Sequence, residues 1–351
     1  METKNITIVD VAHRAGVSKG TVDRVLHQRG EVSQRSIAKV NKAIKELGYE
    51  PNLYASLLAT KKARKLALLL PVHGGGDYWD RIETGFLEGC RDHTSMNVEP
   101  LVFSYDQYDI QSFRKTCEDL LEAAPEGVIL PPFFKNDTLK FVEVLKDRSI
   151  PYVYVDTKLD SGYLACFGMP MARSGALCAA LLTERCAPEE VGRVAIVRIT
   201  RDKNHESDPT AERRSGFMDY MSAHFPSAVI DNVFISPSEP EKIESQLDAY
   251  FLVHTDVRFV VMFNSRIHLI ASYLKAHPVE GRRVIGFDDL DSNRKALRDS
   301  AVSILIAQHT QAQSLGAVQV LTDYLILHKL PQMKDNYMHM DILTSFNEED
   351  Y

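Results

Sequence analysis

Apolar residues recur every three or four positions through much of the first fifty residues, and this spacing predicts three short helices. The first helix would start at Thr7, which forms a capping-box pattern with Asp10 three positions later. The second would cover about 19–28 and the third about 33–47. Three helices of this length can share one core, so the pattern indicates a small all-α domain over residues 1–50.

The connection between the first two predicted helices has the spacing of a helix-turn-helix motif. Gly16 can adopt the left-handed conformation that ends a helix, and Ser18 can cap the next one. In DNA-binding units of this kind the second helix lies in the major groove and its N-terminal residues reach base edges. The alternative is a solvated helix face. Here the expected DNA-facing residues are Thr7, Ser18, Lys19, Gly20, Thr21, Arg24 and His27.

The segment that follows this domain predicts a hinge. Pro51 interrupts the chain, Asn52 is a candidate cap, and one or two helical turns can follow before the sequence changes character near residue 65. A helix this short is not stable alone in water. We therefore expect residues 51–64 to form a hinge helix or linker that orders only against its twin in a dimer or against DNA.

From Lys65 onward, short β-rich runs alternate with amphipathic helical stretches. This alternation predicts parallel sheets covered by helices on both faces, and the units are too numerous for one sheet, which favours two similar lobes with a cleft between them. The predicted strands cover residues 66–71, 98–104, 127–130, 152–155, 194–199, 229–235, 259–263, 284–287 and 302–307.

Polar and aromatic residues gather directly after these strands. Ligands of open parallel sheets bind beyond the carboxyl ends of the strands. Carboxylates and amides pair with hydroxyl groups, a guanidinium donates in a fork, and an aromatic ring covers an apolar C–H face, so this set is typical of a sugar site. The expected ligand-binding residues are Tyr78, Trp79, Asp156, Arg213, Asn264, Asp288 and Gln308.

The charge is unevenly distributed along the chain. Residues 1–65 carry 13 basic and 6 acidic side chains, a net charge of +7, which leaves −14 for the remainder of a chain whose total is −7. A basic head on an acidic body is expected when only the head meets a polyanion, although a basic head could also contact RNA or a membrane. With no apolar run near the ~20 residues of a transmembrane helix and no signal pattern, we expect a soluble cytoplasmic protein.

The sequence offers little support for a catalytic or metal-binding site. The five cysteines include no Cys-x-x-Cys pair, which predicts reduced thiols rather than a disulfide framework or a zinc site. The glycines at 74–76 lack the spacing of a nucleotide-binding loop, and no metalloprotease or nucleophile-elbow motif appears. The sequence therefore predicts a non-enzyme without cofactor or metal.

The head resembles the lactose-repressor (LacI/GalR-type) family of regulators. The resemblance rests on residues 6–12, 15–18, 21–22, 24–26 and 51–55, without a gap over about 60 residues. It implies a homodimer that reads a palindromic operator, with Lys19, Gly20 and Arg24 at the base-reading positions. The hinge residues it brings to DNA are Asn52, Ala55 and Leu58, the last as a wedge in the minor groove.

The body resembles the periplasmic sugar-binding-protein fold that such regulators carry. Residues 213–217 match the family's Arg-x-x-Gly-aromatic ligand motif, and Asn264, 284–289 and Gln308 match further ligand positions. The effector domain would cover 65–345. By the family pattern the first lobe would comprise about 65–168 and 302–330, and the second about 169–301 and 337–345.

Together these patterns predict a sugar-responsive repressor that leaves its operator when ligand closes the cleft. A corepressor mode is equally possible physically, since it needs only a ligand that prefers the DNA-binding state. A phosphorylated sugar or purine is an alternative effector, because Arg201, Lys203, Arg213 and Arg214 could serve a phosphate. A sugar-binding transport protein would leave the head without a purpose.

Overall fold

The computed structural model describes residues 6–26, 32–48, 63–199, 210–237 and 239–350. The chain divides into two compact units, residues 1–62 and 63–351. The predicted hinge at 51–64 lies outside the described residues up to position 62. Each unit is described below by itself.

The small unit contains the three helices that the sequence predicts: α1 (Ile8–Ala15), α2 (Lys19–Leu26) and α3 (Gln34–Leu47). The capping box is present, since the Thr7 hydroxyl accepts from the Asp10 backbone and the Thr7 N–H donates to Asp10 Oδ2 at 2.8 Å. Gly16 adopts the left-handed conformation, with φ of 64°, that ends α1. The core of the unit is apolar and comprises Val11, Ala12, Ala15, Val22, Val40 and Ala43.

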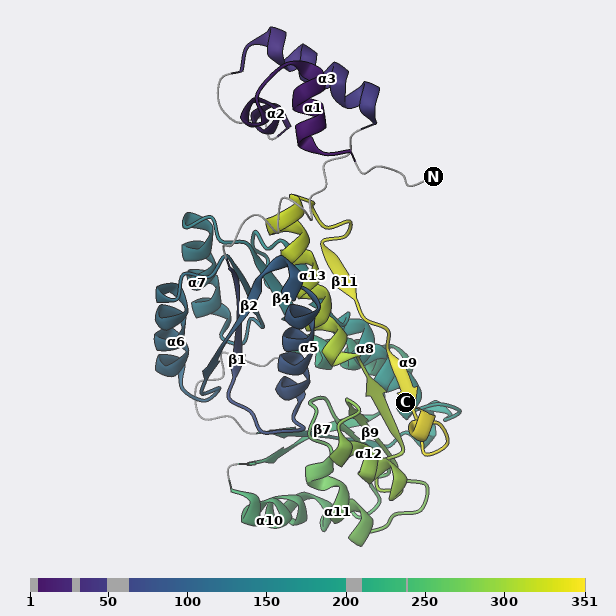
Figure 1. The fold of residues 1–351 in the computed structure, drawn as a ribbon. Helices are drawn as coiled ribbons and strands as arrows, with labels where there is room; N and C mark the ends of the chain where they lie inside the picture. Colours follow the sequence, from purple (N-terminus) through teal and green to yellow (C-terminus); the bar gives the residue numbers. More distant parts are fainter. Residues whose placement is uncertain (1–5, 27–31, 49–62, 200–209, 238, 351) are drawn as a thin grey trace. The chain divides into compact units, whose positions relative to one another are not determined.

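Within its described residues, the large unit contains two six-stranded sheets of matching strand order (Figure 1). The first has the order β11-β5-β4-β3-β1-β2, with β1 (Arg64–Pro71), β2 (Val98–Tyr105), β3 (Gly127–Leu130), β4 (Tyr152–Asp156), β5 (Ala165–Gly168) and β11 (Asp335–Tyr337). The second has the order β12-β10-β9-β8-β6-β7, with β6 (Arg193–Ile199), β7 (Val229–Ile235), β8 (Phe259–Met262), β9 (Arg283–Phe287), β10 (Ile304–Ala307) and β12 (Asp341–Leu343). All pairings are parallel except that of β10 with β12.

Helices cover both faces of each sheet, because the strands are apolar on both sides and must be buried on both. The long C-terminal helix α13 packs on α5 and on the first sheet (Figure 1). The helices of the large unit are α5 (Tyr78–Asp92), α6 (Ile110–Glu122), α7 (Lys135–Asp147), α8 (Met171–Leu182), α9 (Ala211–His224), α10 (Pro240–Phe251), α11 (His268–Ala276), α12 (Asp291–Arg298) and α13 (Thr310–Leu327). In the described part of the chain, none of the helices has the length and apolarity to cross a bilayer.

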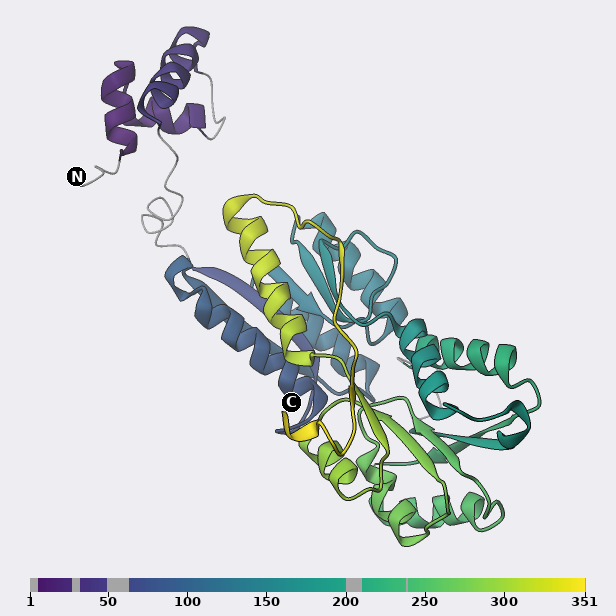
Figure 2. The ribbon, with the colours of Figure 1, turned by 90° about the vertical axis from the view of Figure 1, so that its right-hand side faces the viewer.

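The lobe boundaries differ from the prediction in two places. Strand β10 pairs with β9, so residues 302–307 belong to the second lobe and not to the first. After β10 the chain turns at His309, whose φ of 50° is left-handed, and enters the first lobe as α13. Strand β11 pairs with β5, which places Tyr337 in the first lobe rather than the second, and the chain then returns to form β12 (Figure 2). Local sequence pattern specifies a strand but not the sheet that it joins.

Candidate functional site

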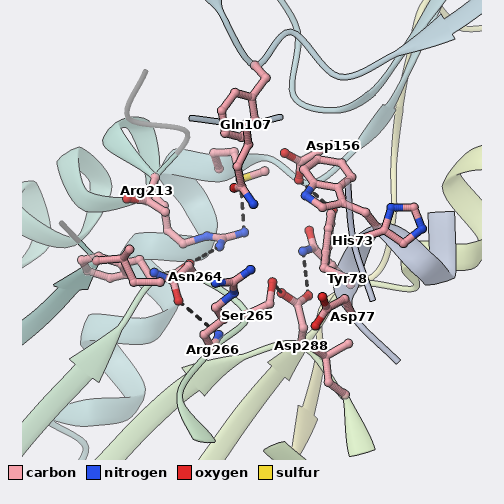
Figure 3. Close-up of a pocket in the computed structure, with 18 of the residues that line it drawn as sticks. His73, Asp77, Tyr78, Gln107, Asp156, Arg213, Asn264, Ser265, Arg266 and Asp288 are labelled. Carbon is pink, nitrogen blue, oxygen red and sulfur yellow. Dashed lines mark hydrogen bonds between the residues drawn. The ribbon is translucent and has the colours of Figure 1, made fainter. Parts of the chain in front are cut away.

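One pocket of the large unit is lined by the ends of strands from both sheets (Figure 3). Its empty space amounts to about 830 Å³, including the part open to solvent. The seven side chains expected at a ligand site all line it: Tyr78, Trp79, Asp156, Arg213, Asn264, Asp288 and Gln308. The structure therefore brings them together, and their binding of a ligand stays a prediction.

The first lobe supplies an aromatic wall and the carboxylates of Asp77 and Asp156. The Tyr78 hydroxyl donates to Asp156 Oδ1 at 2.7 Å, and the Trp79 ring meets Tyr78 edge-on with centroids 4.8 Å apart. The Asp156 N–H donates to Gln313 Oε1 at 2.9 Å, which fixes the strand end. Burial raises the pKa of the Asp156 carboxyl, and burial with the nearby Asp156 charge raises the pKa of Tyr78.

The second lobe supplies a more deeply buried carboxylate. Asp288 is 1% exposed and accepts from Ser265 Oγ at 2.6 Å and from Gln308 Nε2 at 2.7 Å. Burial raises the pKa of Asp288 to about 6, although Arg213 and these two donors act in the opposite direction. Gln308 Oε1 has no hydrogen-bond partner among the described residues, so one buried acceptor beside the pocket is unsatisfied.

Arg213 is a buried cation held by neutral groups. It is 4% exposed, its Nε–H donates to Ser174 Oγ at 3.0 Å and its Nη1 donates to the Phe263 carbonyl at 2.5 Å. Its Nη2 faces the sulfur of Met171 at 3.2 Å, a weak acceptor, and the guanidinium lies 4.0 Å from the centre of the Phe287 ring. Arg213 thus keeps donor capacity for a better acceptor in the pocket.

Two glycines explain how Arg213 reaches this position. Helices α8 and α9 cross so closely that a Cβ at Gly175 would lie 1.7 Å from the Arg213 carbonyl oxygen. A Cβ at Gly216 would lie 1.8 Å from the Ala172 carbonyl oxygen. The glycine of the sequence motif at 213–217 therefore serves helix packing, and the close crossing places Arg213 over the second sheet.

The pocket also contains residues that the sequence reading did not select. They come from loops, two or more positions beyond a strand end or beside a selected residue: His73, Asp77, Gln107, Tyr108, Ser265 and Arg266. No local pattern in the sequence marks them as pocket residues.

The candidate DNA-reading helix is solvent-accessible along its basic face. Lys19, Gly20 and Arg24 are exposed on α2, and the Ser18 hydroxyl accepts from the Thr21 N–H at 3.2 Å. This is the N-terminal cap that the sequence predicts. The remaining candidates lie outside the described residues: His27, Asn52, Ala55 and Leu58, together with Arg201 and Lys203 of the phosphate alternative.

Metal and disulfide chemistry find no support in the described part of the chain. No group of three or more histidine, cysteine or acidic side chains there could hold a metal ion. All five cysteines are free, and four of them are buried.

Family comparisons match both units. The family of bacterial regulatory proteins called the lacI family matches residues 7–52, and the periplasmic binding protein domain matches residues 66–329. The crystal structure of a putative LacI transcriptional regulator from Bacteroides fragilis is 31% identical, with a TM-score of 0.78, over 83% of this chain and 100% of that one.

Curated relatives point the same way. The ribose operon repressor of Lactococcus lactis is 26% identical over 290 residues, which is 82% of both chains. The HTH-type transcriptional regulator RegA of Clostridium saccharobutylicum is 30% identical over 158 residues, so the match spans about half the length of each protein, 45% of this chain and 46% of RegA. The chain belongs to the lacI family of bacterial regulatory proteins, and its large unit is a periplasmic binding protein domain.

Proposed function

We propose that this protein is a transcriptional repressor whose homodimer binds a palindromic operator and releases it when a small neutral sugar occupies the pocket. The observation that carries the proposal is the convergence of Asp156, Asp288, Arg213 and Trp79 on one pocket in a chain that also has an exposed basic helix-turn-helix face. The first set fits a sugar and the second fits DNA.

The chemistry of the pocket favours a hydroxyl-rich ligand. The carboxylates of Asp156 and Asp288 can accept hydrogen bonds from sugar hydroxyls, and the free donors of Arg213 and the amide of Asn264 can bind ring or hydroxyl oxygens. Tyr78 and Trp79 offer apolar ring surface for C–H groups. A relative is named as a repressor of a ribose operon, which agrees with a sugar effector.

A phosphorylated sugar is the second candidate. Arg213 and Arg266 both line the pocket and could bind a phosphate. Three carboxylates, Asp77, Asp156 and Asp288, line it as well and would repel one. The balance of charges therefore favours a neutral ligand.

Induction follows from thermodynamic linkage. If the ligand binds best when the lobes are closed and DNA binds best when they are open, each weakens the other's binding by the same factor. The segment 51–64 would carry the change from the lobes to the DNA-binding unit. A ligand that tightened DNA binding would instead make the protein corepressor-dependent.

A thermal-shift panel on the full chain tests the ligand part of this proposal. Pentoses, hexoses, uronic acids, phosphosugars and purines are each added to the purified protein. A ligand at about 100 times its Kd adds about 2.7 kcal/mol, which gives a clear rise in melting temperature. A shift with a neutral sugar that Asn264→Ala abolishes supports the proposal, and a shift with phosphosugars alone overturns the neutral-sugar class.

A further inference from the structure

Helix α5 begins on a loop that is fixed by its own side chains. The Gly74 N–H donates to Asp77 Oδ2 at 3.1 Å, and the Gly76 N–H donates to Asp80 Oδ2 at 2.8 Å. One turn of helix then separates Tyr78, which lines the pocket, from Arg81, which does not. The two side chains therefore share one rigid base, and only Tyr78 is placed to touch a ligand.

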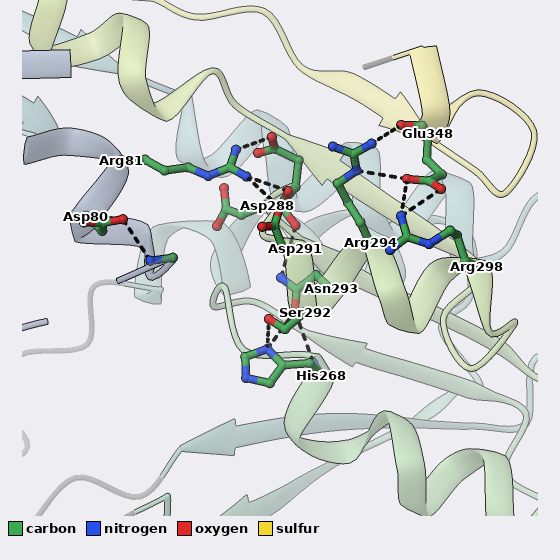
Figure 4. Close-up of polar contacts among 12 residues, drawn as sticks. Asp80, Arg81, His268, Asp288, Asp291, Ser292, Asn293, Arg294, Arg298 and Glu348 are labelled. Carbon is green, nitrogen blue, oxygen red and sulfur yellow. Dashed lines mark hydrogen bonds and ion pairs between the residues drawn. The ribbon is translucent and has the colours of Figure 1, made fainter. Parts of the chain in front are cut away.

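Arg81 reaches from the first lobe to the second (Figure 4). Its Nη1 donates to the Asp289 carboxylate and its Nη2 donates to the Asp289 carbonyl oxygen at 2.9 Å. The Asp291 carboxylate lies 3.8 Å from the same nitrogen. The planar fork of an arginine makes such a two-point contact directional, which a lysine cannot reproduce. The contact thus fixes the distance between α5 and the turn before α12.

The same turn presents Asp288 to the pocket. Asn293 Nδ2 donates to the carbonyl oxygens of Phe287 and Asp288 at 3.0 and 3.1 Å, so this turn moves with α12 as one body (Figure 4). A ligand that bridges the lobes would contact Asp288, and the Arg81 guanidinium bridges them by contacting Asp289. Both contacts therefore require the same distance between the two lobes. Each contact made only in the closed state favours the other.

We propose that Arg81 is a positioning residue whose contact with Asp289 holds the two lobes closed and sets the affinity of the pocket for its ligand without touching it. The effect on affinity rests on the ligand site proposed above. The effect on closure does not, because the contact is made between side-chain and backbone atoms of the two lobes and involves no residue that lines the pocket.

The closure can be measured without a ligand. Trp79 is the only tryptophan of the chain and lines the pocket two residues before Arg81, so acrylamide quenching of its fluorescence reports on cleft opening. The full-length protein is compared with Arg81→Gln, Asp289→Asn and the double variant, at low and high KCl. Arg193→Gln is the matched control, because Arg193 pairs with Asp231 inside the second lobe at a similar exposure, 31% against 27% for Arg81.

We expect each single variant to raise quenching, the double variant to add nothing further, and Arg193→Gln to behave as wild type. High salt should raise quenching in the wild type and not in Arg81→Gln. Wild-type quenching in both single variants, or additive effects in the double variant, would show that the contact does not hold the lobes and would overturn the proposal.

Affinity gives the second readout. D-ribose, D-arabinose, D-glucose and D-galactose are titrated, and Arg81→Gln should weaken the binding of whichever sugar binds by roughly 5-fold or more, with Arg81→Lys recovering part of the loss. Unchanged affinity alongside increased quenching would refute the link between closure and affinity. If none of these sugars binds the wild type, the ligand assignment fails while the quenching result still decides on closure.

Discussion

The two lobes of the large unit share one strand order and yet contribute different chemistry to the pocket. An aspartate with left-handed backbone lies at the end of the fourth strand of each lobe: Asp156, with φ of 69°, is the last residue of β4, and Asp288, with φ of 68°, directly follows β9. Aspartate tolerates this conformation better than most residues, and the turn aims each carboxylate off the end of its strand. The resemblance of the lobes ends there.

The first lobe contributes aromatic rings to the pocket, including Tyr78, Trp79 and Phe133, whereas the second contributes the Arg213 cation and two hydrogen-bond donors to Asp288. A sugar has apolar C–H faces and polar edges, so neither lobe alone satisfies it. This difference explains why binding and closure would be the same event. The variants below test how far the two lobes differ.

The largest effect is expected from Gly216→Ala, which tests whether the second lobe depends on the close crossing of α8 and α9. The added Cβ would meet the Ala172 carbonyl oxygen at 1.8 Å, so the helices must separate. We expect a loss of about 3 kcal/mol or more in stability, measured by urea unfolding of the full chain. Gly192→Ala is the control, since nothing lies within 4 Å of its Cβ. Equal midpoints for the two variants would refute the packing argument.

Asp288→Asn should stabilise the ligand-free protein at neutral pH and weaken the binding of the ligand. The pKa of Asp288 is raised from 3.8 to about 6, so its ionisation above pH 6 costs folding free energy, at most about 3 kcal/mol. The protonated Asp288 carboxyl therefore favours the folded wild type. This contribution is fully present below pH 3.8 and is lost as the pH rises through 6. The variant's advantage should therefore be seen at pH 7–8 in thermal melts and vanish in acid.

The corresponding variant of the first lobe sharpens the comparison. The pKa of Asp156 is also raised by burial, but its carboxylate is less enclosed. Asp156→Asn should therefore gain less stability at pH 7–8 than Asp288→Asn. An equal or larger gain would mean that the two carboxylates occupy equivalent environments.

Arg213→Met should weaken ligand binding and leave the fold in place. A thioether of similar volume keeps the packing on Phe287, whereas the donors to Ser174 and to the ligand are lost. Loss of charged hydrogen bonds costs about 2 kcal/mol, or roughly 30-fold in Kd, measured by calorimetric titration of the sugar found in the panel. Arg214→Met, a neighbouring arginine that does not line the pocket, should bind as the wild type does.

The smallest effect is expected from Tyr78→Phe, which removes only the donor to Asp156 Oδ1. We expect a loss of about 1 kcal/mol in stability, measured by thermal unfolding. The matched control is Tyr108→Phe, because Tyr108 lines the pocket but is 48% exposed. A larger loss of stability in Tyr108→Phe than in Tyr78→Phe would contradict the role given to the Tyr78 hydroxyl.

Periodicity and turn residues were sufficient to predict the three helices of the small unit and most strands and helices of the large one. They missed β5 and β11, which have four and three residues and carry little pattern of their own. The family pattern placed residues 302–307 in the wrong lobe, because the partner of a parallel strand is decided by packing between residues distant in sequence.

The pocket could be predicted in outline because strand ends of parallel sheets converge. The seven chosen side chains meet there, but residues from longer loops such as Gln107 and Arg266 carry no signal that marks them. The contact of Arg81 with Asp289 joins residues 208 positions apart and follows no local pattern. Interactions of this kind become visible only when both lobes are folded.

In the proposed function, one chain couples the binding of a sugar to the release of an operator. The most direct measurement is selection of bound duplexes from a random-sequence pool by the full-length protein, followed by anisotropy titration of the selected duplex with and without the sugar that shifts the melting temperature. The account predicts a palindromic sequence, loss of binding in Arg24→Ala, and a sugar-dependent fall in affinity of roughly 5- to 150-fold. Selection of no sequence, or an affinity that the bound sugar leaves unchanged, would contradict it.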